Sequence, residues 1–425
     1  MSLLKFRIFT ALLLVLSHDT DIAVQAGPSR VARAPVDKLV TLPIKKHLNF
    51  TGPGTMLQHG QARARSLRER AIARPTGVPP SSSEVGGVTI ENQILGYSAY
   101  VNIGTPPTGY ALVVDTGSAN TWVGANQPYV VTSSTETTAN DVEVSYSNGP
   151  WMFGTEYTDT VELGPGLSVR GQSIGVALYS EGFAPYDGIL GLGPTALSIG
   201  TLTPENSLRV PTVTDNLVAQ GVTGQNMVSI FFEPATEGPI GELTFGGVDP
   251  TKFVNEVYYA PITTQFPSSE YYGVDQAVYY GDQLETLLVN NPGILDTATS
   301  LVLLATDAFT KYVAAVGAVF DETVGLYRIT LAQYSNLQSL FFLVGDAVLC
   351  EFTANAQIWP RQLNYAIGGS DQYAYLLVGD IGHVSGSGMD IILGMPFIER
   401  FYTVFDYTHG VVGVGYTEYT DNEGN

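Results

Sequence analysis

Two similar stretches of the chain each contain an aspartate followed by a threonine, a small residue and a hydroxyl residue. ALVVDTGSANTWVGA carries Asp115, and GILDTATSLVLLA carries Asp296. If a twofold axis relates the two copies, Asp115 and Asp296 meet across it, as equivalent residues do in isologous arrangements. Two adjacent carboxyl groups share one proton and titrate as a pair, so one can act as general base on a water while the other polarises a carbonyl. This pattern predicts peptide hydrolysis without a metal or a covalent intermediate.

The residues around each aspartate support this interpretation. Ser118 is placed to donate a hydrogen bond to the first carboxylate, and Thr299 occupies the equivalent place in the second copy. Each copy is followed much later by an apolar pair and a glycine, in YDGILGLG around Ile189 and DIILGMPF around Ile392. A lone Asp-Thr-Gly is a weak signal because Asp and Gly commonly make turns, but as half of a repeat with such partners it is strong.

The part of the chain after about Val88 has the pattern of a β-rich body. Short β-type runs alternate there with Gly, Pro, Asn and Asp, and only TVTDNLVAQG and ATDAFTKYVAAVG predict short helices. Cys350 is the single cysteine, which excludes an intrachain disulfide, and we expect it to be buried in a strand; a reactive thiol is the alternative. The predicted fold class is all-β with a few short helices.

Charge divides the 425-residue chain, whose net charge is −21. Ten basic residues lie between Gly27 and Ser83, against only Asp37 and Glu69, so a basic leader precedes a strongly acidic body. Such a body repels nucleic acid and anionic membranes. It suits a protein that works in acid, where many carboxylates are protonated, although acidic surfaces also serve solubility alone.

The N-terminus has the layout of a secretory signal. Lys5 and Arg7 precede the apolar run from Ile8 to Leu16, and small residues follow near Ala26. The run is too short to span a bilayer, and a buried helix is the alternative. We expect a signal peptide at 1–26, a propeptide at 27–83 and a secreted product without a membrane anchor. Residues 63–84 have the composition of a linker with a helical basic portion.

The body resembles the pepsin-type aspartic proteases, in detail the secreted polyporopepsin-like enzymes of wood-rotting fungi. The likeness covers Val88 to the C-terminus, with its strongest stretches in VVDTGSANTW, FGTEYTDTVELG, YDGILGLGP, GELTFGG and ERFYTVFD. It implies a bilobal pepsin-like fold with two pseudo-twofold-related β lobes. The N-terminal lobe, 84–260, would hold the first catalytic aspartate and a flap, and the C-terminal lobe, 261–425, the second aspartate.

The resemblance also implies roles for individual residues. Asp115 and Asp296 would be the catalytic pair, with Thr116 and Thr297 locking the two active-site loops together. The loops would be supported by Gly117, Ser118, Ala298, Thr299 and Trp122, and substrate would be bound by Tyr146, Asn148 and Gly149. Taken alone, Tyr146 could equally be an ordinary strand tyrosine and Trp122 a core residue.

The basic leader would be an intramolecular inhibitor. Lys45 or Lys46 would pair with the aspartates until acid weakens the contact, and a solvated basic segment is the alternative. The expected partners are protein or peptide substrates and the chain's own propeptide, with no nucleic acid, no membrane and a monomeric state. No cofactor is expected, and the five histidines show no metal-ligand spacing.

Three departures from the family pattern bear on activity. Ala298 stands where the family has glycine, the flap tip reads Tyr146-Ser147-Asn148-Gly149, and Pro150-Trp151-Met152-Phe153 adds apolar bulk. A β-carbon at 298 intrudes where backbone approaches the reacting groups. We therefore keep two function classes: an acid endopeptidase that prefers hydrophobic residues, and a catalytically impaired binding protein that retains the cleft. A carboxylate-pair glycosidase is a third possibility in principle, but the matched Asp-Thr repeat speaks against it.

Overall fold

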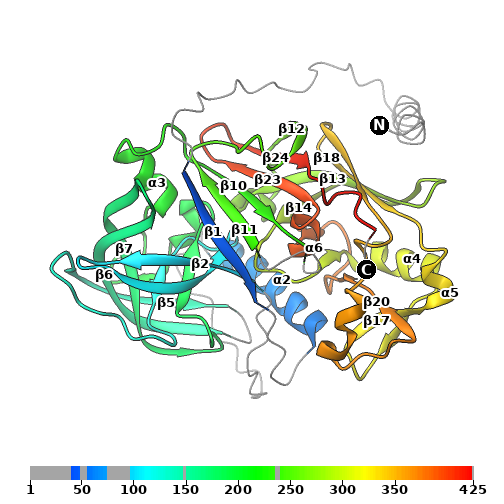
Figure 1. The fold of residues 1–425 in the computed structure, drawn as a ribbon, viewed down its shortest axis with the longest axis horizontal. Helices are drawn as coiled ribbons and strands as arrows, with labels where there is room; N and C mark the ends of the chain where they lie inside the picture. Colours follow the sequence, from blue (N-terminus) through cyan, green and yellow to red (C-terminus); the bar gives the residue numbers. More distant parts are fainter. Residues whose placement is uncertain (1–39, 48–54, 74–95, 147–149, 235–239, 424–425) are drawn as a thin grey trace.

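The computed structural model describes residues 40–47, 55–73, 96–146, 150–234 and 240–423 (Figure 1). These residues form strands with a few short helices, so the predicted all-β class is confirmed. The proposed signal peptide lies outside the described residues. Within the described part, no helix has the length and apolar character needed to cross a membrane.

Fourteen of the described strands form one large sheet that draws on both ends of the chain. In spatial order the strands are β12 (Val254–Pro261), β24 (Val411–Tyr416), β23 (Phe401–Asp406), β10 (Met227–Phe232), β11 (Ile240–Phe245), β1 (Val40–His47), β2 (Gly96–Ile103), β3 (Thr108–Asp115), β8 (Gly188–Gly191), β4 (Trp122–Val123), β7 (Leu167–Glu181), β6 (Trp151–Gly164), β5 (Glu136–Ser145) and β9 (Leu202–Thr203).

Two smaller sheets are built from the second half of the chain. The first contains β19 (Val348–Phe352), β18 (Leu340–Val344), β13 (Gly273–Tyr280), β14 (Glu285–Leu295), β22 (Ile391–Leu393), β15 (Val302–Leu304) and β21 (Val378–Asp380). The second contains β16 (Val319–Asp321), β17 (Leu326–Thr330) and β20 (Tyr373–Tyr375).

The helices are short except for α2 (Met56–Ala73), which has 18 residues. The two helices expected in the body are confirmed as α3 (Val213–Ala219) and α4 (Thr306–Val316). A capping box between Thr212 and Asp215 begins α3, because each side chain bonds the other's backbone N–H. The remaining helical segments are η3 (Thr195–Ser198), η4 (Ser268–Glu270), α5 (Leu331–Tyr334), η5 (Arg361–Ile367) and α6 (Met395–Ile398).

The strands that lead to the two aspartates have the same surroundings. β3 pairs in parallel with β8, and β14 pairs in parallel with β22. These partners are the apolar segments of YDGILGLG and DIILGMPF, so the late apolar-glycine segments of the repeat lie beside the aspartate strands in both halves. The internal repeat in the sequence is therefore a structural repeat.

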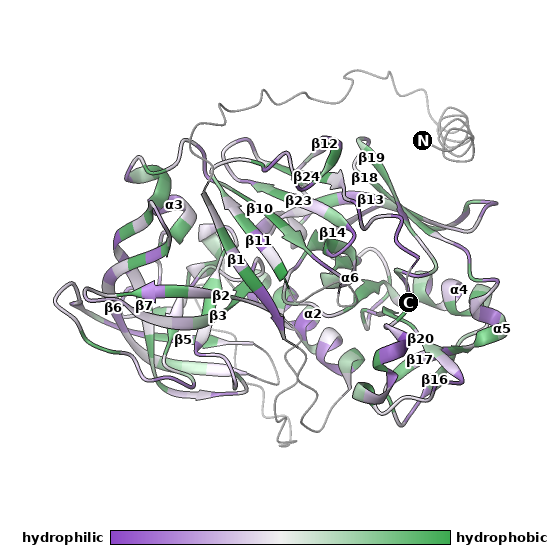
Figure 2. Ribbon diagram, viewed as in Figure 1, coloured by the Kyte–Doolittle hydropathy of each residue, from purple (hydrophilic) through white to green (hydrophobic). Residues whose placement is uncertain are grey.

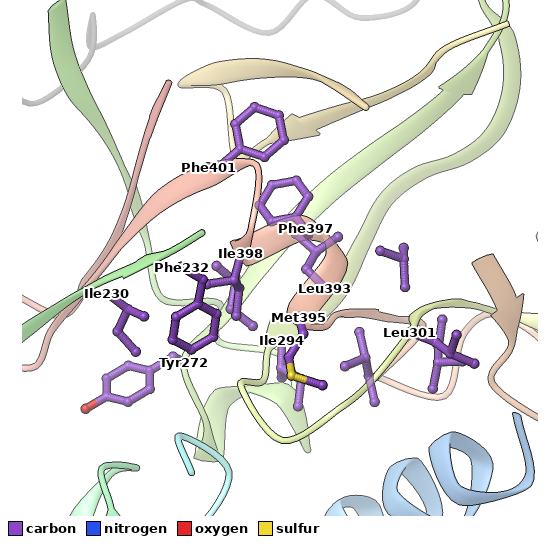
Figure 3. Close-up of a cluster of buried hydrophobic side chains, with 14 of the residues drawn as sticks. Ile230, Phe232, Tyr272, Ile294, Leu301, Leu393, Met395, Phe397, Ile398 and Phe401 are labelled. Carbon is purple, nitrogen blue, oxygen red and sulfur yellow. The ribbon is translucent and has the colours of Figure 1, made fainter. Parts of the chain in front are cut away.

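A continuous apolar core fixes these strands. Figure 3 shows the part around the second aspartate strand, where Ile294, Leu393, Met395 and Phe397 gather, each at most 3% exposed. Cys350 is fully buried on β19, which confirms the expected strand position, and burial raises the pKa of its thiol. Shielding of this depth makes the thiol unreactive in the folded chain.

The described parts of the basic leader, residues 40–47 and 55–73, are packed into the molecule. β1 lies between β2 and β11 in the large sheet, and α2 lies between the half that carries β5–β7 and the half that carries β17 and β20 (Figure 1). Along β1 the hydropathy of the residues changes from mostly hydrophobic to hydrophilic towards the C-terminal end of the strand (Figure 2). The helical portion expected at the start of residues 63–84 is confirmed as part of α2, and it is packed, because Ala64, Leu67 and Ala71 are completely buried. The Pro, Gly and Ser portion that follows lies outside the described residues.

Candidate active site

Asp115 and Asp296 lie at equivalent places in the two halves. Asp115 is the last residue of β3, and Asp296 follows the last residue of β14. Both side chains are fully buried, and one guanidinium nitrogen lies within hydrogen-bonding distance of both. The structure thus brings together the two aspartates that the repeat singled out.

Each carboxylate is held by a hydroxyl three residues later. Ser118 Oγ donates to Asp115 Oδ2 at 2.6 Å, and Thr299 Oγ1 donates to Asp296 Oδ2 at 2.5 Å. The backbone N–H of Gly117 also donates to Asp115 Oδ1 at 2.8 Å. Hydrogen bonds of this kind fix the orientation of a carboxylate and favour its charged form.

The threonines after the aspartates join the two loops by reciprocal hydrogen bonds. The N–H of Thr116 donates to Thr297 Oγ1 at 3.0 Å, and the N–H of Thr297 donates to Thr116 Oγ1 at 3.1 Å. The Thr116 hydroxyl also donates to the carbonyl oxygen of Leu295, and the Thr297 hydroxyl donates to the carbonyl oxygen of Val114. All these groups are buried, so the loops are tied by bonds that water cannot replace.

Glycines allow close packing around the loops. A β-carbon at Gly193 would lie 2.7 Å from the carbonyl oxygen of Thr116, and one at Gly394 would collide with the carbonyl oxygen of Thr299. A β-carbon at Gly117 would lie 2.7 Å from Asp296 Oδ1. At the equivalent position Ala298 is partly exposed, so the second loop carries a methyl group where the first requires glycine.

An arginine of the leader connects both aspartates. Arg63, on α2, donates from Nη2 to Asp115 Oδ1 at 2.5 Å and to Asp296 Oδ1 at 2.9 Å, and from Nε to Asp296 Oδ2 at 3.0 Å. A planar guanidinium suits such a contact because its donors form a rigid fork. The cation compensates two carboxylates that could not both stay charged unaided in a buried site.

Ionisation at the site follows from this contact. Burial on its own would raise the pKa of Asp115, but the Arg63 guanidinium and the Ser118 hydroxyl outweigh burial and hold that pKa below its ordinary value. Burial would likewise lower the pKa of Arg63, yet the two carboxylates raise it well above its usual range. With the leader in place, the ion pair therefore persists until the solution is more acidic than an ordinary aspartate requires.

The expectation that Lys45 or Lys46 pairs with the aspartates is wrong. Lys45 is exposed on β1, and Lys46 forms a mostly buried ion pair with Glu399. β1 belongs to the large sheet, and its register there directs Lys46 towards Glu399 and Tyr97. Sequence reasoning missed Arg63, although it lies in the helical basic portion that the composition had indicated.

Tyr146 and Trp122 form an aromatic cluster beside the first aspartate. Trp122 Nε1 donates to the Tyr146 hydroxyl at 3.2 Å, and both rings contact Phe183 edge-on. Burial raises the pKa of Tyr146 to about 12, so its hydroxyl is neutral throughout the acid and neutral range. Asn148 and Gly149, the other expected substrate-binding residues, lie outside the described residues.

Other residues of α2 contact both halves of the chain near the aspartates. The side chain of Leu67 reaches the loop at Gly117, and Tyr271 donates its hydroxyl to the Leu67 carbonyl oxygen at 2.6 Å. Gln61 donates to the carbonyl oxygen of Asp380. Among the described residues, no group of three or more histidine, cysteine, aspartate or glutamate side chains is placed to hold a metal ion.

Comparisons with known proteins agree with this geometry. Residues 96–417 match a family model described as Eukaryotic aspartyl protease. Polyporopepsin from Irpex lacteus is 50% identical over 342 residues, which are 80% of this chain and 99% of that protein. Rhizopuspepsin from Rhizopus chinensis is 28% identical over 403 residues, 91% of this chain and 94% of that protein. The solved structure of an aspartic proteinase from Irpex lacteus matches with a TM-score of 0.75 at 50% identity, covering 78% of this chain and 96% of that chain.

Replacing Thr297 by alanine should destabilise the fold. The change removes the acceptor for the buried N–H of Thr116, and an unsatisfied buried donor costs about 1–3 kcal/mol. Urea unfolding should show a loss of this size for Thr297→Ala and for Thr116→Ala, because each substitution removes the acceptor of one buried backbone N–H. The exposed Thr310→Ala is the control, and a loss in either variant no larger than that of the control would contradict the stabilising role of these bonds.

Proposed function

Because the chain belongs to the eukaryotic aspartyl protease family and is a pepsin-like aspartic endopeptidase of bilobal fold, we propose that Asp115 and Asp296 are its catalytic pair. The observation that carries the proposal is their convergence from two copies of one motif onto a single nitrogen of Arg63. In the same proposal, the enzyme is made as an inactive precursor that acid activates.

The reaction proceeds by general acid–base catalysis once the cation has left. The two carboxyl groups then hold one proton between them. The ionised member takes a proton from water, which attacks the peptide carbonyl carbon, while the protonated member donates its proton to the carbonyl oxygen. When this adduct collapses, the C–N bond breaks and the nitrogen takes the proton that the first carboxyl group had received from water. The second carboxylate takes a proton from a hydroxyl of the adduct, so the pair again holds one proton. Ser118 and Thr299 keep each carboxylate oriented by their hydrogen bonds.

The leader inhibits the enzyme by charge and by volume. Arg63 neutralises both aspartates, and α2 fills the space where a substrate must lie. The ion pair stabilises leader docking at a pH above the ordinary pKa of aspartate, since the pKa of Asp115 is lowered when the leader is bound. This stabilisation is lost as the pH falls through the lowered value. Acid therefore loosens the leader.

Substrate preference follows from what α2 places next to the catalytic loops. The Leu67 side chain is buried next to Gly117 of the first loop. A β-carbon added to Gly117 would lie only 3.0 Å from Leu67, so an aliphatic side chain fits directly beside this loop. We propose cleavage between hydrophobic residues of protein or peptide substrates. Secretion as a monomer is proposed from the signal-like residues 1–26 and the acidic body.

Asp115→Asn should abolish cleavage of a denatured protein across about pH 3 to 6, the range in which a carboxyl pair holds one charge. Loss of the general base should lower kcat by at least about a hundredfold. The measurement compares acid-treated wild type, with and without pepstatin, and the exposed-site control Asp282→Asn. Activity that survives in Asp115→Asn, or that pepstatin leaves intact, would contradict the proposed pair.

Arg63→Gln should let the precursor convert at higher pH than the wild type. The variant removes the cation that holds the pKa of Asp115 low, so docking loses the ion pair that acid otherwise has to break. Mass spectrometry of samples held at graded pH gives the pH of half-conversion. Arg65→Gln, on the exposed face of the same helix, is the charge-matched control. An unchanged conversion pH in Arg63→Gln would argue against inhibition through this contact.

Ala298→Gly should raise kcat of the mature enzyme. The methyl group lies on the loop after Asp296, and a displacement of about one ångström at a reacting centre can cost about a hundredfold, which sets the upper limit of the gain. Steady-state kinetics on one peptide substrate measures the change. An unchanged kcat would show that the loop accommodates the alanine without cost.

A further inference from the structure

Helix α2 contacts the catalytic site through two arginines with different kinds of partners. Arg63 and Arg70 are seven residues apart, so both project from one face of the helix. Arg63 meets the two carboxylates. Arg70 donates from Nη2 to the carbonyl oxygen of Gly117 at 3.3 Å, and its guanidinium carbon lies 5.5 Å from the centre of the Tyr146 ring.

The Arg70 contact joins three parts of the molecule. Gly117 belongs to the first catalytic loop, and Tyr146 follows β5 at the hairpin that β5 and β6 form. Tyr146 itself is 7% exposed and is fixed by the hydrogen bond from Trp122. A guanidinium over the face of a tyrosine ring is attracted by the ring's electrons, and desolvation strengthens that attraction.

We propose that Arg70 is a latch that keeps the leader on the hairpin tyrosine after acid has weakened the Arg63 ion pairs. This inference rests on the proposed function and adds a second step to activation. Acid opens the carboxylate contacts of α2, while the Arg70 contact with the Tyr146 ring holds the helix in place. Activity therefore appears only at a lower pH, or after a longer time, than protonation of the aspartates alone requires.

The partners of Arg70 explain why acid does not open this contact directly. Its hydrogen-bond acceptor is a backbone carbonyl, and its ring partner remains neutral below the raised pKa of Tyr146. The other charged groups that act on this pair are Asp115 on β3 and Arg63 on the same helix. Protonation of Asp115 removes one distant attraction on Arg70 and leaves the ring contact and the carbonyl contact unchanged.

The first test measures conversion of the full-length precursor in Arg70→Gln, Arg70→Lys, Arg65→Gln and wild type. At the pH where wild type is half-converted, Arg70→Gln should convert about tenfold faster, the size expected for one desolvated cation–ring contact. Arg70→Lys should recover part of this difference, because lysine keeps the charge and loses the planar fork. Arg65→Gln should match wild type. All variants yield the same mature chain, so kcat after full conversion is an internal control.

Hydrogen exchange on the uncleaved precursor at neutral pH gives a second readout that needs no catalysis. Arg70→Gln should increase exchange in α2 and in β5 and β6, and Arg65→Gln should not. Equal conversion rates and equal exchange in Arg70→Gln and Arg65→Gln would overturn the latch while leaving the protease assignment intact.

Failure of the proposed function gives a different result from failure of the latch alone. A wild-type chain that never gains pepstatin-sensitive activity would refute the proposed catalytic pair and the two-step activation together. Exchange that is raised in Arg70→Gln under that outcome would show only a packing contact, and the latch would still be rejected.

Discussion

Two buried carboxylates of like charge in one site are the constraint on which this structure depends. Asp115 and Asp296 are both fully buried, and their mutual repulsion in a site shielded from water can be relieved only by a shared proton or by a cation. In this structure the cation is Arg63. The repulsion between the two carboxylates favours binding of a shared proton. For the same reason it favours binding of a cation from the basic leader.

The twofold repeat surrounds the two aspartates with equivalent strands and hydrogen-bonding residues. Each aspartate ends a strand that is paired in parallel with a later apolar segment, and each is followed by a hydroxyl that bonds its carboxylate. Thr116 and Thr297 then link the halves so that neither loop can shift alone. Ala298 breaks the symmetry, because it is partly exposed and carries a methyl group where Gly117 of the first loop is buried.

The leader is bound by interactions that differ in their response to acid. Lys46 with Glu399 and Arg63 with the aspartates are ion pairs to carboxylates. The contacts of Tyr271 with the Leu67 carbonyl oxygen and of Arg70 with the Tyr146 ring involve no carboxylate. β1 adds backbone pairings to β11 from Val40 to Lys45 and to β2 from Ile44 to His47. A leader held in this way is a structural part of the chain, and loss of its ion pairs leaves the other contacts in place.

The sequence by itself determined the repeat, the β-rich class, the two short helices and the residues that carry the carboxylate chemistry. These features are local patterns of residue type and spacing, and the twofold repeat made even the meeting of Asp115 and Asp296 predictable. Which leader residue reaches the pair was decided only by the tertiary structure. Lys46 and Arg63 are both basic residues of the same segment, and the pairing register of β1 and the packing of α2 alone direct the first to Glu399 and the second to the aspartates. β1 itself was missed, although Val40, Leu42 and Ile44 alternate with other residues as a strand requires, because a place in the middle of a sheet depends on strands far away in the sequence.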